Sequence, residues 1–202
     1  MDEEKRMVDT FEIKYAIHVG DREIIFAVDD TKIDYPYMVC SCTWDNPFGG
    51  EEYSNAAASA DYLEMMAEFT SRVTAQLEAV KAERDKITVP LQIFTLDHCI
   101  PNDYGGSIEN KVVVIRAECL RPEYRTADKL LMLATGGFGT HANSRGRAVY
   151  TMNLYSGKES RWNREDILGM VKPECMPDWA KERLKQIQTE RQAKHKKQEP
   201  ER

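Results

Sequence analysis

Alternation of apolar and polar residues in the first third of the chain limits what it can fold into. In FEIKYAIHV (11–19) apolar side chains occupy every second position, a period typical of a strand with one buried face. A Gly-Asp pair follows at 20–21, and REIIFAV (22–28) supplies a second strand-like run. YPYMVCSCTW (35–44) supplies a third. We therefore predict that the chain begins with a meander of antiparallel strands.

Two cysteines share a face of the third predicted strand, because alternate residues of a strand point the same way. Cys40 and Cys42 could bind a metal, with His98 and Cys99 as the best further ligands. The CxxC spacing of a convincing zinc site is missing, and a buried cysteine packs as a small apolar residue. A total of five cysteines in a chain of this size favours reduced thiols. We predict core packing, no metal and no other cofactor.

A loop and a long helix are predicted to follow the meander. WDNPFGGEEYSNAAAS (44–59) contains Pro and Gly and is predicted to be a loop. From about 59 to 86, apolar residues recur every three or four positions, as on one face of an amphipathic helix about 40 Å long. These residues are Tyr62, Met66, Phe69, Val73, Leu77 and Val80. A helix this long is often paired, so a homodimer is an open alternative.

The second half of the chain contains further strand-like runs. They are VPLQIFTL (89–96), KVVVIRAECL (111–120), LLMLAT (130–135), residues 146–157 and ESRWN (159–163). Asn163 is predicted to cap a helix over REDILGMV (164–171), because its side-chain oxygen can accept a hydrogen bond from a free helix N–H. Pro177 is predicted to open the last helix.

The predicted fold class is α+β, with a mixed, mostly antiparallel sheet, one long amphipathic helix and a helical C-terminal end. With 202 residues the chain can bury the core of one large domain, which we place at 1–180. We expect residues 181–202 to form a basic tail that is helical at first and frayed at its end.

Charge is unevenly distributed along the chain, whose formal net charge is −6. Residues 1–61 contain 14 Asp and Glu against 5 Lys and Arg, whereas 181–202 contain 8 Lys and Arg against 4 Glu. An acidic surface repels nucleic acid and attracts basic protein surfaces. The predicted partner-binding residues are Asp29, Asp30, Asp34, Asp45, Phe48, Glu51, Glu52 and Tyr53. The alternative is that the carboxylates serve solubility and the aromatic residues pack onto the core.

A glycine-rich stretch at residues 133–150, which begins LATGGFGTHANSR, is the candidate anion-binding loop. Its candidate residues are Gly136, Gly137, Gly139, His141, Arg145 and Arg147. The loop lies between two predicted strands and lacks the Lys-Ser/Thr of a P-loop, which argues against a nucleotide cradle. The alternative is that the glycines permit a tight reversal and the arginines pair with the acidic first third.

No complete catalytic motif is present. GxSxG and HExxH are absent, and no Ser or Cys stands in a context that implies an activated nucleophile. Asp97, His98 and Cys99 are adjacent, but neighbours on a strand point in opposite directions, so they are not predicted to form a catalytic dyad. We predict no catalytic residues.

The chain lacks any run of 18 apolar residues, which argues against a membrane span. Its start, MDEEKRMVDT, is acidic and polar, unlike a secretory signal. We expect a cytoplasmic protein that does not bind membranes.

Three stretches together resemble a known group of proteins. CTWDNPFGGEEYSNA, residues 112–150 and SGKESRWNREDILGMVKP are similar to an uncharacterised accessory-protein family of bacterial conjugative and integrative elements. The resemblance covers about residues 35–180, although this chain has Ser144 where the family has alanine before the first arginine. It implies a setting, since such elements often encode inhibitors of host defence. No activity or site residue comes with it.

Together, the acidic first third and this setting predict a non-enzymatic protein that inhibits a host defence nuclease of the anti-CRISPR or antirestriction type. Its partner would be the basic surface of a nuclease or effector complex. One alternative is a nucleic-acid-binding accessory factor that uses the basic tail with Arg145 and Arg147. The other is an enzyme that binds a small anionic substrate at the glycine-rich loop.

Overall fold

The computed structural model of this chain describes residues 5–44 and 50–198, and the side chains of 5–44 and 50–190. The chain divides into two compact units, Met1–Lys86 (the N-terminal unit) and Ile87–Arg202 (the C-terminal unit). Their boundary falls inside the range 1–180, for which the sequence predicts one domain. Helices are combined with antiparallel sheets, so the predicted α+β class is confirmed. The described strands form two sheets instead of the single mixed sheet expected from the sequence.

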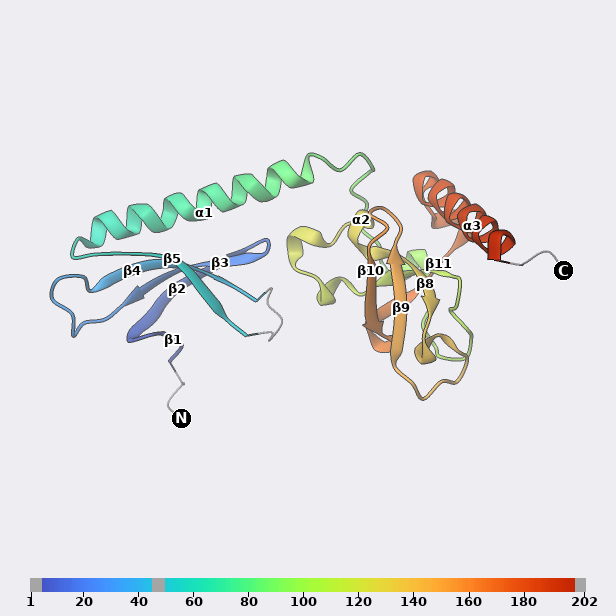
Figure 1. Ribbon diagram of the computed structural model, residues 1–202, viewed down its shortest axis with the longest axis horizontal. Helices are drawn as coiled ribbons and strands as arrows, with labels where there is room; N and C mark the ends of the chain where they lie inside the picture. The colour runs from blue at the N-terminus through green and yellow to red at the C-terminus, as the bar shows by residue number, and fades with distance from the viewer. Residues whose placement is uncertain (1–4, 45–49, 199–202) are drawn as a thin grey trace. The chain divides into compact units, whose positions relative to one another are not determined.

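The N-terminal unit is a five-stranded antiparallel meander with one long helix across a face (Figure 1). The helix, α1 (Tyr62–Arg84), begins at Asp61, whose carboxylate accepts a hydrogen bond from the Leu63 N–H at 2.8 Å. The strands follow in chain order: β1 (Met7–Val8), β2 (Phe11–Val19), β3 (Arg22–Val28), β4 (Tyr37–Thr43) and β5 (Glu52–Ser59).

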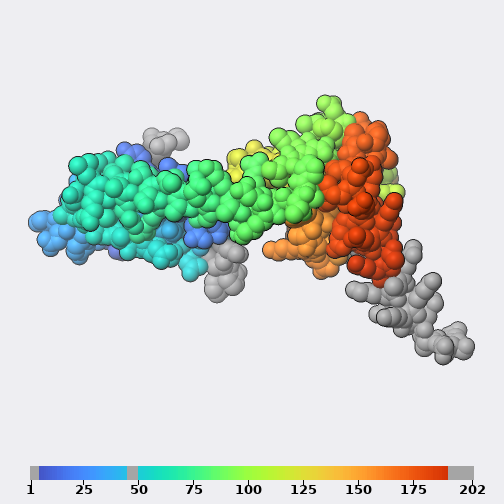
Figure 2. Space-filling view, turned by 90° about the horizontal axis from the view of Figure 1, so that it is seen from above, coloured from blue at the N-terminus to red at the C-terminus, as the bar shows by residue number. Residues whose placement is uncertain are grey.

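Both faces of this sheet carry apolar clusters. On the helix face, Ile24, Phe26 and Val39 pack with Met65 and Phe69 of α1. On the opposite face lie Phe11, Ile25, Ala27, Met38, Cys40 and Cys42, with Trp44 and Tyr53 at the margin. The predicted common face of Cys40 and Cys42 is therefore confirmed. Figure 2, seen from the side of α1, shows that no other described segment of this unit lies over the outer surface of the helix.

Strand β5 corrects the prediction of a loop over 44–59. Its Ser, Asn and Ala residues have low strand propensity, but the open edge of β4 offers backbone hydrogen-bond partners. Asn55 has a φ of 55°, close to a register shift between Val39 and Ser41. Such a bulge bends the strand and changes the direction of its side chains.

The C-terminal unit contains a six-stranded antiparallel sheet in the order β10-β9-β8-β7-β11-β6. Its strands are β6 (Cys99–Pro101), β7 (Val112–Ile115), β8 (Leu131–Gly136), β9 (Ala148–Asn153), β10 (Glu159–Asn163) and β11 (Ile167–Val171). Its helices are the short α2 (Ala127–Leu130) and the C-terminal α3 (Asp178–Gln198). Strand β7 is buried at all four positions, as its continuous apolar run predicts for a central strand.

Two further predicted elements differ from those observed. Residues 89–96 contain no strand, and their end enters the 3₁₀ turn Leu96–His98. ILGMV forms strand β11 instead of a helix: Ile167, Gly169 and Val171 are buried, while the residues between them are half-buried. Asn163 precedes only a 3₁₀ turn (Arg164–Asp166), where its backbone N–H donates to Asp166 Oδ2 at 2.8 Å. A short apolar run does not distinguish strand from helix by periodicity.

Helix α3 packs onto the core of the C-terminal unit. Ala180 and Ile187 are buried in it, and Trp179 and Leu184 lie against it. Part of the predicted tail, up to residue 190, is thus packed against the sheet. Among the described residues, no helix is both long and apolar enough to cross a membrane.

Candidate functional site

The predicted acidic residues do not converge on one place. Asp29, Asp30 and Asp34 lie in the β3–β4 connection, whereas Glu51, Glu52 and Tyr53 lie at the start of β5, where Tyr53 pairs with Cys42. The two groups flank opposite ends of β4, and seven strand residues span about 23 Å. Asp45 and Phe48 lie outside the described residues.

Asp29 is an internal anchor of the β3–β4 connection and is only 6% exposed. Its Oδ1 accepts hydrogen bonds from the Thr31 hydroxyl at 2.6 Å and the Thr31 N–H at 3.0 Å. Lys32 Nζ lies 3.7 Å from Oδ2. The hydrogen bonds from Thr31, together with one from Thr10, lower the pKa of Asp29 to about 2. This carboxylate holds the loop in shape and is not available to a partner.

Three connections meet at this end of the sheet. The interaction between Asp29 and Thr10 joins the β3–β4 connection to the β1–β2 turn. The rings of Tyr37, at the start of β4, and Tyr62, in the first turn of α1, lie 5.3 Å apart. The exposed acidic residues of these connections, which we call the acidic end, are Asp9, Asp30, Asp34, Asp61 and Glu64.

Sequence reasoning found only two members of the acidic end. In an antiparallel meander every second connection returns to the same end of the sheet. The turn at 9–10, the loop at 29–36 and the start of α1 therefore share an end. If this rule is applied to the predicted strands, it adds Asp9 to the acidic end. Asp61 and Glu64 cannot be added in this way, because their position depends on β5, which the sequence does not predict.

Exposed apolar side chains accompany the acidic end. Ile33 is 91% exposed and Tyr35 is 48% exposed, both in the β3–β4 connection. Leu63, in the first turn of α1, is 75% exposed. Aliphatic and aromatic side chains among exposed carboxylates combine apolar contact area with negative charge, as protein-binding surfaces do.

At the opposite end of β4, Glu51 neutralises an arginine of its own unit. Arg6 lies 2.6 Å from Glu23 and 2.9 Å from Glu51 in salt bridges, and its guanidinium lies over the Trp44 ring. Tyr53 donates its hydroxyl hydrogen to Glu51, and burial, followed by this bond, raises the pKa of Tyr53 to about 12. Glu52 is exposed.

The glycine-rich loop joins β8 to β9, two strands, as the sequence predicts. Its glycines allow close packing of the chain on itself. A Cβ on Gly137, whose φ is 104°, would lie 2.5 Å from the Ala148 carbonyl oxygen, and one on Gly146 would lie 2.5 Å from Phe138 Cβ. A Cβ on Gly139 would meet the Arg147 carbonyl. The space above these three glycines is therefore filled by the loop itself.

A buried arginine organises this loop. Arg164 is 2% exposed, and its guanidinium donates to the carbonyl oxygens of Gly139 at 2.9 Å and Gly106 at 3.1 Å. It also donates to Asn102 Oδ1 at 2.7 Å. Burial lowers the pKa of Arg164. One side chain thus ties residues 102–106 to the glycine-rich loop.

The loop presents an aromatic and basic surface. Phe138 is 78% exposed, and Tyr150 on β9 is 54% exposed and faces Arg161 of β10 in the register. Arg145 and His141 are exposed. Arg147 lies 3.3 Å from Glu165, so it pairs within the C-terminal unit and not with the acidic first third.

The thiols and the Asp97–Cys99 stretch lack the features of a catalytic or metal centre. Cys40, Cys42 and Cys99 are buried, and burial raises the pKa of Cys40 and of Cys99 to about 11. His98 Nδ1 accepts the Thr95 N–H at 3.0 Å in a local turn. Within residues 5–44 and 50–190, whose side chains the structure describes, no group of three or more His, Cys, Asp or Glu could hold a metal ion.

In comparisons with protein-family models, curated proteins and solved structures, nothing matches this chain.

Proposed function

We propose that this protein is a non-enzymatic inhibitor that binds the basic surface of a bacterial defence nuclease, of the anti-CRISPR or antirestriction type, through its acidic end. The observation that carries the proposal is the acidic end itself: five exposed carboxylates contributed by three connections of one unit. Asp30 and Asp34 remain from the predicted site, and Asp9, Asp61 and Glu64 join them.

The charge of the N-terminal unit supports this proposal. Residues 1–86 contain 19 Asp and Glu against 9 Lys and Arg, a net charge of −10. Residues 87–202 contain 15 against 19, a net charge of +4. A compact unit with this excess of negative charge attracts basic surfaces over about a Debye length and raises the rate of encounter with them.

The partner class follows from the chemistry of the surface. Nucleases expose basic channels that bind phosphates, and fixed carboxylates can occupy the places of those phosphates. Ile33 and Leu63 add apolar contact area, which supplies most of the binding energy in protein interfaces. The resemblance to proteins of mobile elements points to the same class of partner.

The test is capture and inhibition with purified CRISPR effectors and restriction endonucleases. The full chain is immobilised, and each nuclease is applied at about 50 mM and about 300 mM salt. We expect salt-sensitive capture of at least one nuclease and inhibition of its cleavage activity. Replacing both aspartates of the β3–β4 connection with lysine, Asp30→Lys with Asp34→Lys, should reduce affinity by at least about tenfold.

The matched control makes the same charge change elsewhere on the unit. Glu83→Lys with Asp85→Lys reverses two exposed carboxylates at the far end of α1. It should reduce affinity by less than about threefold, through the long-range field alone. Equal loss in both variants, or no capture of any nuclease, would contradict the proposal.

A second candidate function is binding of single-stranded nucleic acid by the C-terminal unit. It rests on Phe138, which stays 78% exposed on a loop that Arg164 holds in place, beside exposed Arg145. Bases stack on exposed aromatic rings, while arginines contact phosphates. Fluorescence anisotropy with a labelled single-stranded oligonucleotide tests it.

Phe138→Ala and Arg145→Ala should each weaken this binding by about tenfold, whereas Arg121→Ala, an exposed arginine outside the loop, should not. The predicted contribution of the basic tail is tested by ending the chain after residue 190, because Ile187 belongs to the core. Equal binding by all four variants and the parent chain would exclude the loop and the tail as the binding surface.

A further inference from the structure

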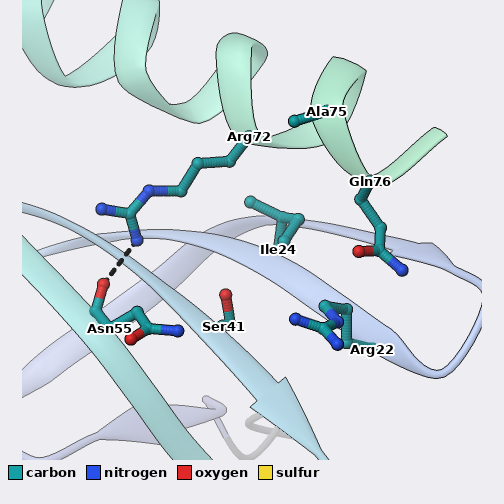
Figure 3. A pocket seen from close by; sticks show the side chains of 7 residues that line it. All are labelled: Arg22, Ile24, Ser41, Asn55, Arg72, Ala75 and Gln76. Atoms are coloured by element: carbon teal, nitrogen blue, oxygen red, sulfur yellow. Dashed lines mark hydrogen bonds between the residues drawn. The ribbon is translucent and has the colours of Figure 1, made fainter. Parts of the chain in front are cut away.

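A cavity of about 390 Å³ lies between α1 and the sheet of the N-terminal unit. Figure 3 shows the side chains that line it, from β3, β4, β5 and one face of α1: Arg22, Ile24, Ser41, Asn55, Arg72, Ala75 and Gln76. The cavity lies at the lower end of the size range of small-molecule sites. All of its lining residues belong to one unit.

Ser41 places a hydroxyl at this cavity. The residue is 6% exposed, and its hydroxyl makes no hydrogen bond to any described residue. In Figure 3 the hydroxyl points from β4 into the space beneath α1. The hydroxyl opens into the cavity, where it can donate a hydrogen bond to a ligand.

Two guanidinium groups reach the same cavity with donors to spare. Arg22 donates Nε and Nη2 to Asp21, and Arg72 donates Nε to Glu68 at 2.6 Å and Nη1 to the Asn55 carbonyl. Each guanidinium has five N–H groups, so both keep donors for an anion. The two carboxylates occupy only part of each guanidinium group.

We propose that this cavity binds a small carboxylic acid that also carries a hydroxyl or amino group, with its carboxylate held by Arg22, Arg72 and Ser41. The anion is a singly charged carboxylate and not a phosphate dianion, because Asp21 and Glu68 already balance the charges of the two arginines and the unit is acidic. Gln76 donates both amide hydrogens, to Val19 O and Asp21, so its oxygen accepts the hydroxyl or amino hydrogen of the ligand.

The other side chains that line the cavity limit the size of the part of the ligand beyond its carboxylate. Ile24 and Ala75 supply apolar contact, and Asn55, placed by the bulge in β5, lines the cavity from that strand. A carbon skeleton of three to five atoms, as in lactate or alanine, fits within the cavity.

The test is an NMR titration of the full-length, ¹⁵N-labelled chain, which follows the side-chain Nε–H signals of Arg22 and Arg72. Lactate and alanine are the probes, with acetate and inorganic phosphate for comparison. We expect saturable shifts of both arginine signals with a Kd of about 1 mM or tighter for lactate or alanine, and weaker binding of acetate. No shift up to about 20 mM, or phosphate binding more tightly than both probes, would overturn the proposal.

Two variants of opposite sign separate binding from a structural role. Arg72→Gln should weaken binding at least about tenfold, because a charge-assisted hydrogen bond is lost. Glu68→Gln removes the carboxylate that competes for Arg72, so it should tighten binding by about two- to fivefold. Arg84→Gln, an exposed arginine in the last turn of α1, is the control and should change nothing. Weaker binding in both Arg72→Gln and Glu68→Gln would contradict the assignment.

Discussion

A loop in each unit is organised by a buried charged side chain, and the two charges have opposite signs. Asp29 holds the β3–β4 connection in the N-terminal unit, and Arg164 holds the glycine-rich loop in the C-terminal unit. Asp29 has a counter-ion, since Lys32 lies 3.7 Å away. Arg164 has no carboxylate within 4.0 Å among the described residues and relies on carbonyl and amide oxygens.

The difference shows two ways to keep a charge inside a small protein. A counter-ion neutralises the charge, whereas carbonyl dipoles only compensate for its lost hydration. Arg164 also contacts residues that are distant from it in sequence, including Asn102 and Thr140. Asp29, in contrast, accepts hydrogen bonds from Thr31, which lies two residues further along the chain. The loop of the C-terminal unit should therefore depend more strongly on its buried charge.

The largest expected effect is that of Arg164→Met. It leaves the carbonyls of Gly106 and Gly139 and the Asn102 amide oxygen without their donor, and should lower the free energy of unfolding by about 3–5 kcal/mol. Urea denaturation measures it, with Arg161→Met, an exposed neighbour, as the control at under about 0.5 kcal/mol. A similar small loss in both variants would mean that the carbonyls find other donors.

The next effect concerns the backbone that Arg164 holds. Gly137→Ala places a Cβ 2.5 Å from the Ala148 carbonyl oxygen at a φ of 104°, and should destabilise the chain by about 2–4 kcal/mol. Gly106→Ala, which has open space for its Cβ, should change stability by less than about 0.5 kcal/mol. Thermal unfolding of the two variants tests whether the glycine-rich loop is closely packed. A flexible loop would tolerate both substitutions equally well.

Acid titration tests the role of Asp29. Its pKa is about 2 in the folded chain against an ordinary value of 3.8, so its carboxylate stabilises the fold fully above about pH 4. This contribution is lost as the pH falls from about 4 through about 2. Asp29→Asn should be less stable than the parent chain at pH 6, and the difference should shrink towards pH 2. A constant difference across this range would show that the charge of Asp29 is not what stabilises the loop.

The smallest effect is expected at the neighbours of Asp29. Asp30 and Asp34 are exposed and form no ion pair within the described residues, so Asp30→Asn with Asp34→Asn should change the free energy of unfolding by less than about 0.5 kcal/mol. Chemical denaturation measures this. A larger loss would assign these carboxylates to the structure and remove them from the proposed interface.

Much of the fold could be predicted from local patterns. Strands 11–19 and 22–28 were predicted at their observed bounds, because their alternation is long and regular. Strands β5 and β11 could not be predicted, since their ladders come from β4 and β7, which lie beside them only in the folded chain. Gly169 is an example. Because it has no side chain, the Ile100 carbonyl can approach it closely, and the sequence alone does not reveal this contact.

The candidate sites were less accessible to sequence reasoning. Counting carboxylates along the chain grouped Asp29 with Glu51, although the two flank opposite ends of a strand, and gave no indication that Asp29 is buried. The glycine-rich loop was correctly placed between strands, but Arg164, which organises it, lies outside the loop sequence. The cavity beneath α1 depends on β5 and was not foreseen.

Helix α1 begins at the acidic end and stops two residues before the N-terminal unit does. Its 23 residues span about 35 Å, so the acidic end lies a full helix length from the point where the chain leaves this unit.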